Sequence, residues 1–301
     1  MKELMLAVAV GAAAVCMAGS AESVDMRVGT YNIRNGNCDK GTPNAWEQRR
    51  SDLVALLRKM DLDAFGLQEA HPYQTGFLKK ALPEYAMVGE YRNANRRSGE
   101  GSPVFYRKSR FDAVKSGTFW LSETPDVPGS KSWETACPRV CSWVLLKDKK
   151  TGKAFCFANT HTDHKSALAR KEGMLLIIRR MKEFAPLGTP IVFTGDHNCH
   201  EGSEPARAVA NLLKDSIYAT ETPPKGPWRT LNAWQWRDKE SSCAQELKKK
   251  LEKRSWWNKR IDYIYVSKSV KVKSHEVRPD ARPGAKLYPS DHFPVMATIE
   301  L

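Results

Sequence analysis

Short apolar runs of strand-like composition recur along the chain, and polar residues adjoin each of them. The runs are residues 26–30, 64–67, 154–158, 191–193 and 295–301. The last run alternates, with apolar side chains at Val295, Ala297, Ile299 and Leu301. Alternation with a period of two is typical of a strand that buries one face. We therefore predict strands at these five positions.

Three longer segments carry apolar residues at helical spacing. They are Trp46–Met60, Lys165–Phe184 and Ser203–Leu213, and a serine suited to an N-cap begins the third. Strand-like and helix-like segments alternate, so the predicted fold class is α/β, with a two-sheet β-sandwich flanked by helices. At 301 residues with 41% apolar residues, the chain is large enough to form one domain with a substantial core.

Five polar clusters lie at the ends of the predicted strands. They are Tyr31-Asn32-Ile33, Leu67-Gln68-Glu69, Asn159 to His164, Thr194 to Asn198, and Ser290-Asp291-His292. A single cluster of this kind would be interpreted as a turn or a helix cap. Five together bring Asn, Glu, Asp and His side chains to strand ends, and such oxygen-rich groups suit a hard cation such as Mg²⁺.

The Ser-Asp-His sequence before the last strand is the most informative of the five clusters. Asp291 places a carboxylate directly beside the imidazole of His292. A histidine at the mouth of a sheet with an acid next to it suits proton transfer or the stabilisation of an oxyanion. Together with the other clusters, it predicts a catalytic site rather than a set of turns.

The same motifs, taken in chain order, resemble those of a known family. The series Tyr-Asn-Ile, Gln-Glu, Asn-Thr-His, Gly-Asp-x-Asn, Arg-Ile-Asp-Tyr at 260–263 and Ser-Asp-His is similar to the endonuclease/exonuclease/phosphatase superfamily, which has the deoxyribonuclease I-like fold. The resemblance covers about residues 27–301. It implies a four-layer α/β/β/α sandwich of two mainly antiparallel sheets, in a secreted bacterial-type member of the family.

The resemblance implies a divalent metal ion held by acidic residues. Glu69 would be the principal ligand, Asn32 would lie close to the metal and the scissile phosphate, and Asp291 would lie on the metal side. Mg²⁺ is the expected cation, with Mn²⁺ or Ca²⁺ as alternatives. Such an ion offsets negative charge as a phosphoester is attacked.

The resemblance also implies which residues are catalytic. Asp196 and Asn198 would orient the attacking water and hold phosphate oxygens. His292 would contact the phosphate, with Asp262 orienting its imidazole. His161 would be a second histidine that protonates the leaving group. Enzymes resembling exonuclease III generally use a tyrosine for this last role, so the pattern is closer to deoxyribonuclease I, the sphingomyelinases and the inositol phosphatases.

Four further residues are expected to support the substrate phosphate. Glu100 resembles the acid that pairs with the second histidine, and Arg139 resembles an arginine that grips the phosphate. Asp163 and His164 complete this supporting group. These motifs leave the substrate open, because loops at the strand ends set substrate choice on such a fold.

The first residues of the chain have the pattern of a targeting segment. Lys2 gives a positive start, Leu4–Met17 form an apolar run that is short for a transmembrane span, and small residues suited to cleavage follow. We therefore expect a signal peptide at 1–22 and one domain at 23–301. The protein would be exported, periplasmic or extracellular, with no transmembrane segment in its mature chain.

Six cysteines follow the predicted signal peptide, at positions 38, 137, 141, 156, 199 and 243. An even number in an exported protein permits disulfides, and Cys137 and Cys141 are close enough in sequence to pair. Buried free thiols account for the pattern equally well. The spacings do not match a zinc site.

Positive charge is concentrated in one segment of the chain, whose net charge is +14. Residues 225–260 hold eleven Lys and Arg against four Asp and Glu, a net +7, together with five of the nine tryptophans. Basic residues interleaved with aromatics suit nucleic-acid binding through phosphate attraction and base stacking. The alternatives are a solvated helix face at 248–254 over tryptophans packed in the core, and a surface for anionic lipid headgroups.

Three functions are compatible with these observations. The first is a secreted, monomeric, divalent-metal-dependent phosphodiesterase that acts on nucleic acid by metal-assisted water attack with two histidines. The second applies the same machinery to a phospholipid such as sphingomyelin, where Trp256 and Trp257 would enter the membrane interface, or to a phosphorylated small molecule. The third is a catalytically silent binding protein, which a missing ligand or histidine would favour, and none is missing.

Overall fold

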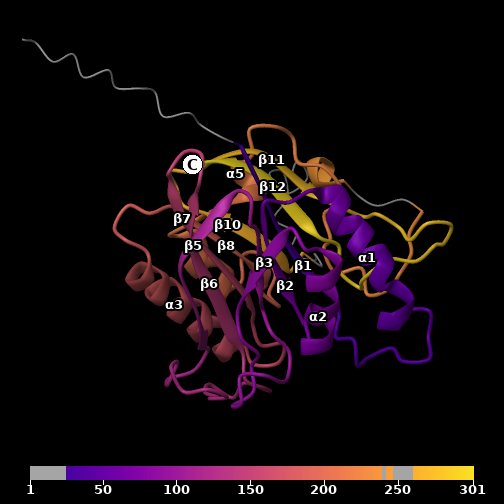
Figure 1. The fold of residues 1–301 in the computed structure, drawn as a ribbon, viewed down its shortest axis with the longest axis horizontal. Helices are drawn as coiled ribbons and strands as arrows, with labels where there is room; N and C mark the ends of the chain where they lie inside the picture. The colour runs from indigo at the N-terminus through magenta and orange to yellow at the C-terminus, as the bar shows by residue number, and fades with distance from the viewer. Residues whose placement is uncertain (1–24, 239–241, 247–259) are drawn as a thin grey trace, which may run out of the picture.

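The computed structural model describes residues 25–238, 242–246 and 260–301, which form two six-stranded sheets packed face to face (Figure 1). The predicted signal peptide at 1–22, the predicted helix face at 248–254 and the pair Trp256 and Trp257 lie outside the described residues. No helix within the described ranges is long and apolar enough to cross a membrane.

The order of the strands in space differs from their order in the chain. In spatial order, the first sheet contains β11 (Lys271–Val277), β12 (Val295–Glu300), β1 (Met26–Asn32), β2 (Ala64–Gln68), β4 (Val104–Arg107) and β3 (Tyr85–Val88). The second contains β5 (Phe111–Trp120), β6 (Val140–Asp148), β7 (Ala154–His161), β8 (Ile191–Asp196), β10 (Asp262–Val266) and β9 (Lys214–Asp215). All five predicted strands are present within these sheets.

Each sheet is antiparallel except for one pair of neighbouring strands. The parallel pairs are β1–β2 in the first sheet and β7–β8 in the second. Parallel neighbours need a crossover connection, which α1 (Trp46–Met60) supplies in the first sheet and α3 (Ala167–Phe184) in the second. The carboxyl ends of both parallel pairs lie at the same end of the sandwich, where the site described below is found.

The helices follow the predicted segments closely. α1 has the predicted bounds, and α3 begins at Ala167 because the Ser166 side chain caps it by accepting a hydrogen bond from the Ala169 backbone N–H at 3.0 Å. α4 (Glu204–Ala210) has Ser203 at its N-cap position but ends three residues earlier than predicted. Among the described elements, α2 (Pro72–Ala81) and α5 (Ser216–Ala219) have no counterpart in the predicted set.

Three hydrophobic layers hold the sandwich together. Residues such as Val28 and Phe157 form the core between the two sheets. Leu53 lies in a second core between α1, α2 and the first sheet, and Ile177 in a third between α3, α4 and the second sheet. The result is the expected four-layer α/β/β/α sandwich, with α1 and α2 on one outer face and α3 on the other (Figure 1).

The core between the sheets changes from apolar to polar toward one end. On β1 the inward positions are Val28, Thr30 and Asn32 in succession, all buried. The Gln68 amide on β2 donates to Asn159 Oδ1 on β7 at 2.6 Å and so joins the two sheets. Buried polar groups are tolerated where they are hydrogen-bonded in this way. Asn32, at this polar end of the core, belongs to the site described below.

Of the described tryptophans of the basic segment, Trp228 is buried, and Trp234 and Trp236 are partly buried against other side chains. Trp228 is 2% exposed, and Trp236 stacks on Tyr288 with ring centroids 5.1 Å apart. Trp234 lies 5.6 Å from the guanidinium of Arg49. These three fit the packed alternative rather than an exposed surface for base stacking.

All six cysteines after the predicted signal peptide are free thiols. Cys141, Cys156, Cys199 and Cys243 are buried, whereas Cys38 and Cys137 are partly exposed. The pairing of Cys137 with Cys141 is therefore not formed, and the free-thiol alternative describes the chain.

Candidate active site

The polar ends of the two sheets meet at one place. His161 and Asp196 are register partners at the ends of β7 and β8, and Asp262 lies opposite Asp196 at the start of β10. Asn32 ends β1 in the other sheet. Parallel strands end at a common edge and an antiparallel neighbour begins there. The topology itself therefore brings these side chains together.

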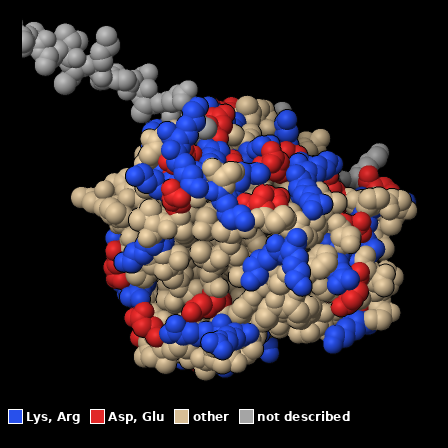
Figure 2. Space-filling model, in the orientation of Figure 1, with Lys and Arg blue, Asp and Glu red and all other residues tan. Residues whose placement is uncertain are grey.

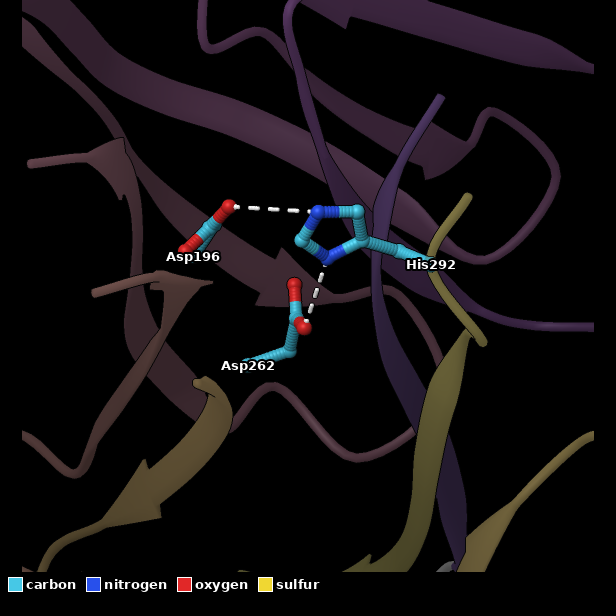
Figure 3. A group of neighbouring side chains, drawn as sticks. All are labelled: Asp196, Asp262 and His292. Atoms are coloured by element: carbon cyan, nitrogen blue, oxygen red, sulfur yellow. Dashed lines mark hydrogen bonds and ion pairs between the residues drawn. The ribbon is translucent and has the colours of Figure 1, made fainter. Parts of the chain in front are cut away.

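His292 lies just before β12 and is held between two carboxylates (Figure 3). Its Nδ1 is 2.9 Å from Asp262 Oδ2, and its Nε2 is 3.8 Å from Asp196 Oδ2. All three residues are buried. The contact with Asp262 fits the expectation that this carboxylate orients the imidazole.

The electrostatics of this group favour a charged imidazole. Burial by itself lowers the pKa of His292, but Asp262, Asp196 and Asp291 outweigh it and raise that pKa well above its ordinary value. Burial and the neighbouring charge of Asp262 raise the pKa of Asp196. An imidazolium fixed between carboxylates can stabilise negative charge that develops on a phosphoryl group.

Asn32 connects Asp196 to Glu69. Its Nδ2 donates to Glu69 Oε1 at 3.0 Å and to Asp196 Oδ2 at 2.9 Å. Glu69 follows β2 with a φ of 59°, in the left-handed region, and its Oε2 accepts a hydrogen bond from the Asn35 backbone N–H at 2.6 Å. Such a backbone conformation costs about 1–3 kcal/mol in a residue other than glycine and is found mainly where a site requires it.

His161 and Asn198 form a second polar pair on the same cleft. Asn198 Nδ2 lies 2.8 Å from His161 Nε2 and donates to the Thr162 carbonyl at 3.1 Å. The Asn198 backbone N–H donates to Asp196 Oδ1 at 2.9 Å. Burial, together with the charge of Arg139, lowers the pKa of His161 well below its ordinary value. His161 is therefore neutral at pH 7.

Glu100 lies near His161 but binds other residues. Its Oε1 accepts from Asn35 Nδ2 at 2.8 Å, and its Oε2 accepts from Arg92 Nη1 at 2.5 Å. Within the described residues no hydrogen bond joins Glu100 to His161, and His161 Nδ1 has no partner. The direct pair implied by the family resemblance is thus absent from the contacts of this structure.

Arg139 is buried and faces the cleft beside His164. Its Nη2 lies 2.9 Å from His164 Nδ1, and its Nε is 3.8 Å from Asp163 Oδ2. The Asp163 carboxylate accepts four hydrogen bonds, from groups of residues 135, 136, 165 and 166. Asp163 therefore fixes the loop that precedes α3, whereas Arg139 and His164 face the cleft.

Asp291 is held on the side of Glu69. Its Oδ2 is 3.3 Å from Arg34 Nη1. The backbone carbonyl of Asp291 accepts the N–H groups of Asn232 and Ala233 at 2.8 and 2.9 Å, and Leu231 pairs with His292 as an isolated bridge. The segment around Leu231 therefore packs directly against the Asp291–His292 segment.

A cleft of about 380 Å³ opens over these residues. Nine of the twelve predicted site residues line it, namely Glu69, Glu100, Arg139, His161, His164, Asp196, Asn198, Asp291 and His292. The other three, Asn32, Asp163 and Asp262, are buried behind them and bond to the lining or to its loops. The sequence motifs had not pointed to Arg34, Asn35 and Arg92, which also line the cleft.

One group of described residues has donor atoms close enough to hold a metal ion. Asp196, Asp262 and His292 present donor atoms within 4.8 Å of one another and are buried (Figure 3). Glu69 and Asp291, the predicted oxygen ligands, both line the cleft. Burial comes first among the causes that raise the pKa of Asp291, and the charge of Glu69 raises it further. A divalent cation would offset this repulsion.

Comparison with known proteins identifies the family. The profile of the Endonuclease/Exonuclease/phosphatase family matches residues 29–292. The chain belongs to this family. A family protein from Bacteroides thetaiotaomicron is 35% identical, with 94% of this chain and 97% of that chain covered and a TM-score of 0.82. A mannosyl-6-phosphatase from the same organism is also 35% identical, with 91% and 99% covered and a TM-score of 0.80.

The chain is also similar to Nocturnin of Drosophila melanogaster, with 25% identity over 288 residues. The match covers 85% of this chain and 42% of Nocturnin, so the chain spans less than half of that relative. Members of the Endonuclease/Exonuclease/phosphatase family are divalent-metal-dependent hydrolases of phosphoesters. The buried Asp196–Asp262–His292 group could bind such a metal.

Proposed function

We propose that this protein is a divalent-metal-dependent phosphoric ester hydrolase that acts on a small phosphorylated molecule, such as a sugar phosphate. The observation that carries the proposal is the position of Asp196. Its carboxylate lies within 4 Å of polar atoms of Asn32, His161, Asn198 and His292, beside a cleft lined by arginines. This arrangement suits the activation of water next to a bound phosphate.

The size of the cleft supports a small substrate. Its volume of about 380 Å³ lies at the lower end of the range of about 300–1,000 Å³ that is usual for small-molecule sites. The 35% identity with a mannosyl-6-phosphatase over 91% of the chain supports the same substrate class. Three arginines, Arg34, Arg92 and Arg139, line the cleft and supply positive charge for an anionic ester.

Glu69 and Asp291 would hold the divalent cation, which supplies charge neutralisation at the phosphate. Both residues line the cleft, and their all-oxygen donor set favours Mg²⁺, with Mn²⁺ or Ca²⁺ as alternatives. The Asn32 amide donates to Glu69, and its oxygen accepts the Arg34 backbone N–H at 3.0 Å. Asn32 would therefore orient the metal ligand rather than bind the ion itself. The Asp196–Asp262–His292 group is less suited to hold this cation, because His292 Nδ1 is already bonded to Asp262.

The other residues would act on water and the phosphoryl group. Asp196 would accept a proton from the attacking water, held in place by Asn32 and Asn198. His292, charged and fixed by Asp262, would stabilise the negative charge that develops on the phosphoryl oxygens. Arg139 would bind a phosphate oxygen.

A phosphodiesterase that acts on nucleic acid is the second candidate, because the chain carries a net charge of +14. Lys and Arg spread over much of the face in Figure 2, interspersed with Asp and Glu. Trp228 of the basic segment is buried, however, and the partly exposed Trp234 and Trp236 pack against Arg49 and Tyr288, which leaves little tryptophan surface for base stacking. The sphingomyelinase alternative depends on Trp256 and Trp257, which lie outside the described residues. A catalytically silent binding protein would be favoured by the loss of a predicted metal ligand or histidine, and the sequence contains all of them.

The test compares hydrolysis of several phosphoesters by one preparation, with Mg²⁺ and with EDTA. The substrates are mannose 6-phosphate, bis(p-nitrophenyl) phosphate, plasmid DNA, RNA and sphingomyelin liposomes. We expect phosphate release from the sugar phosphate that requires metal and is lost in Asp196→Asn. An exposed aspartate on β5 serves as the control, since Asp112→Asn should leave activity unchanged. Nicking of DNA without this activity would show that the substrate is a nucleic acid. Release of choline phosphate without it would show that the substrate is a phospholipid.

A further inference from the structure

A small cavity lies beside His161, next to the main cleft. Its volume is about 10 Å³, close to the smallest space of roughly 10–15 Å³ that holds one water molecule. His161, Glu100, Arg139 and Val140 are among the residues that line it. The cavity is thus polar and of the size of a single water.

The polar groups around this cavity have room for a further partner, although Glu100 Oε2 already accepts a hydrogen bond from Arg92 Nη1 at 2.5 Å. His161 Nδ1 is buried and has no hydrogen-bond partner among the described residues. Arg139 Nη1 and Glu100 Oε2 are 4.0 Å apart, which is too far for a direct hydrogen bond. Buried polar atoms in native proteins are nearly always satisfied by protein or by ordered water. A gap of this length between two charged groups is one that a bridging water spans.

The hydrogen bonds of Asn198 favour one tautomer of His161. The Thr162 carbonyl can only accept, so the Asn198 atom 3.1 Å from it must be the amide nitrogen. The same nitrogen lies 2.8 Å from His161 Nε2, whereas Asp196 Oδ2 lies 3.5 Å from that ring nitrogen. The shorter contact favours a lone pair on Nε2 that accepts from Asn198, with the proton of the neutral ring on Nδ1. Nδ1–H is thus a buried donor without an acceptor.

We propose that one water molecule occupies this cavity and bridges His161 to Glu100. The water accepts hydrogen bonds from His161 Nδ1–H and Arg139 Nη1–H and donates one to Glu100 Oε2. Three partners are the usual number for a buried water. The bridge takes the place of the direct carboxylate–histidine pair that the family resemblance implies.

The bridge gives Glu100 and Arg139 a positioning role toward His161. It holds the proton on Nδ1, so Nε2 presents its lone pair to Asn198 and the cleft. When Asp196, whose Oδ2 lies 3.5 Å from Nε2, passes to Nε2 the proton that it accepted from the attacking water, the negative charge of Glu100 stabilises the imidazolium through the bridging water. This catalytic consequence rests on the proposed function, whereas the water site and the tautomer do not.

A high-resolution crystal structure and the ¹⁵N chemical shifts of the His161 ring test the site without any activity measurement. We expect a density peak within hydrogen-bonding distance of His161 Nδ1, Arg139 Nη1 and Glu100 Oε2. The ring should show a protonated Nδ1 and an unprotonated Nε2. A direct bond between Glu100 and His161, an empty cavity, or a proton on Nε2 would overturn the proposal.

Two variants then test what the water does. Val140→Ile adds a methylene to the lining and should displace the water, with a loss of about tenfold in kcat and little change in KM. Val144→Ile makes the same change on the same strand but in the core between the sheets, and it controls for overpacking. If Val140→Ile does not fold, Glu100→Gln keeps the shape of the residue and removes its charge. The Glu100→Gln protein should retain the water but have a lower kcat. An unchanged kcat in Glu100→Gln would contradict the positioning role. So would an unchanged kcat in a Val140→Ile protein that is shown to lack the water.

Discussion

Asn32 and Asp196, the last residues of β1 and β8, are joined by a hydrogen bond of 2.9 Å although they are 164 positions apart and belong to different sheets. The same Asn32 nitrogen also donates to Glu69. The metal side and the water side of the candidate site are therefore connected through one amide. This connection exists only when the two sheets are packed together.

Replacing Asn32 by alanine should disable the site more than the fold. Asn32→Ala removes the donor shared by Asp196 and Glu69, so both carboxylates lose their orientation, and we expect kcat to fall by about 10²–10³-fold. Phosphate release and thermal melting measure the two effects. Asn37→Ala is the matched control, because Asn37 is exposed and bonds to His71 and Tyr73 instead. Equal losses in the two variants would contradict the role given to Asn32.

The pH dependence of stability should report the interaction between His292 and Asp262. The folded pKa of His292 is raised above an unfolded value of about 6.5. The stabilisation is therefore fully present below pH ~6.5 and is lost as the pH rises through the folded pKa. In Asp262→Asn this loss between neutral and alkaline pH should largely disappear, and kcat should fall by about 10²–10⁴-fold. Urea unfolding of both proteins across that pH range measures the difference, and identical pH profiles would refute it.

Metal dependence should be weakened by a change at Glu69. Glu69→Gln keeps the size of the side chain but removes a charged oxygen ligand, and we expect a loss of about 10–100-fold or more in apparent Mg²⁺ affinity. Thermal shift against Mg²⁺ concentration measures this, because a ligand of the native state raises its stability. Glu90→Gln is the control, since Glu90 is paired with Arg96 near the surface. Full activity of the wild-type protein in the presence of EDTA would contradict the metal-dependent mechanism.

Arg49 should be essential for stability although it lies outside the catalytic group. Its side chain is 1% exposed and donates to the carbonyls of residues 33, 34, 44 and 289. It thereby ties the loop after β1 to the segment that carries Asp291 and His292. Arg49→Met leaves these acceptors unpaired and should lower the free energy of unfolding by about 3 kcal/mol or more.

The neighbouring arginine provides a matched control for this change. Arg50 stacks on Phe77 with its guanidinium 4.7 Å from the ring centroid, and a contact of this kind contributes about 0.5–1 kcal/mol at an exposed site. Arg50→Met should therefore cost much less than Arg49→Met in denaturant unfolding. A cost of similar size for both variants would show that Arg49 does not hold the two segments together.

Part of this protein could be predicted from sequence because the information is local. Each candidate residue on a strand end follows or precedes an apolar run, as Asn32 follows Met26–Thr30 and Asp196 follows Ile191–Phe193. The period of side-chain burial is a property of neighbouring residues. Strand positions, the bounds of α1 and the ordered motifs could therefore be predicted, and with them nine residues that line the cleft.

Other features depend on how the chain folds and not on the local pattern of residues. Arg92 binds Glu100 within the β3–β4 loop, where the Arg92 backbone N–H also donates to the Glu100 carbonyl at 2.9 Å, and no motif marks this contact in the sequence. Composition made the tryptophans of the basic segment compatible with an exposed binding surface, but Trp228 is buried. Cys137 and Cys141 are four residues apart in sequence, but they differ in exposure and do not pair. Cys141 is buried, whereas Cys137 is partly exposed and lines the cleft.

The sequence by itself determined which residue types stand at the strand ends and hence the family and the kind of chemistry. Only the tertiary structure decided which partner each of them has. Glu100 bonds to Arg92 and Asn35 rather than to His161, and Asp196 accepts a hydrogen bond from Asn32 of the other sheet. The physical reason is that a hydrogen bond forms only when the donor–acceptor distance is within a few tenths of an ångström of about 3 Å. Sheet packing sets such distances between residues that are far apart in the chain.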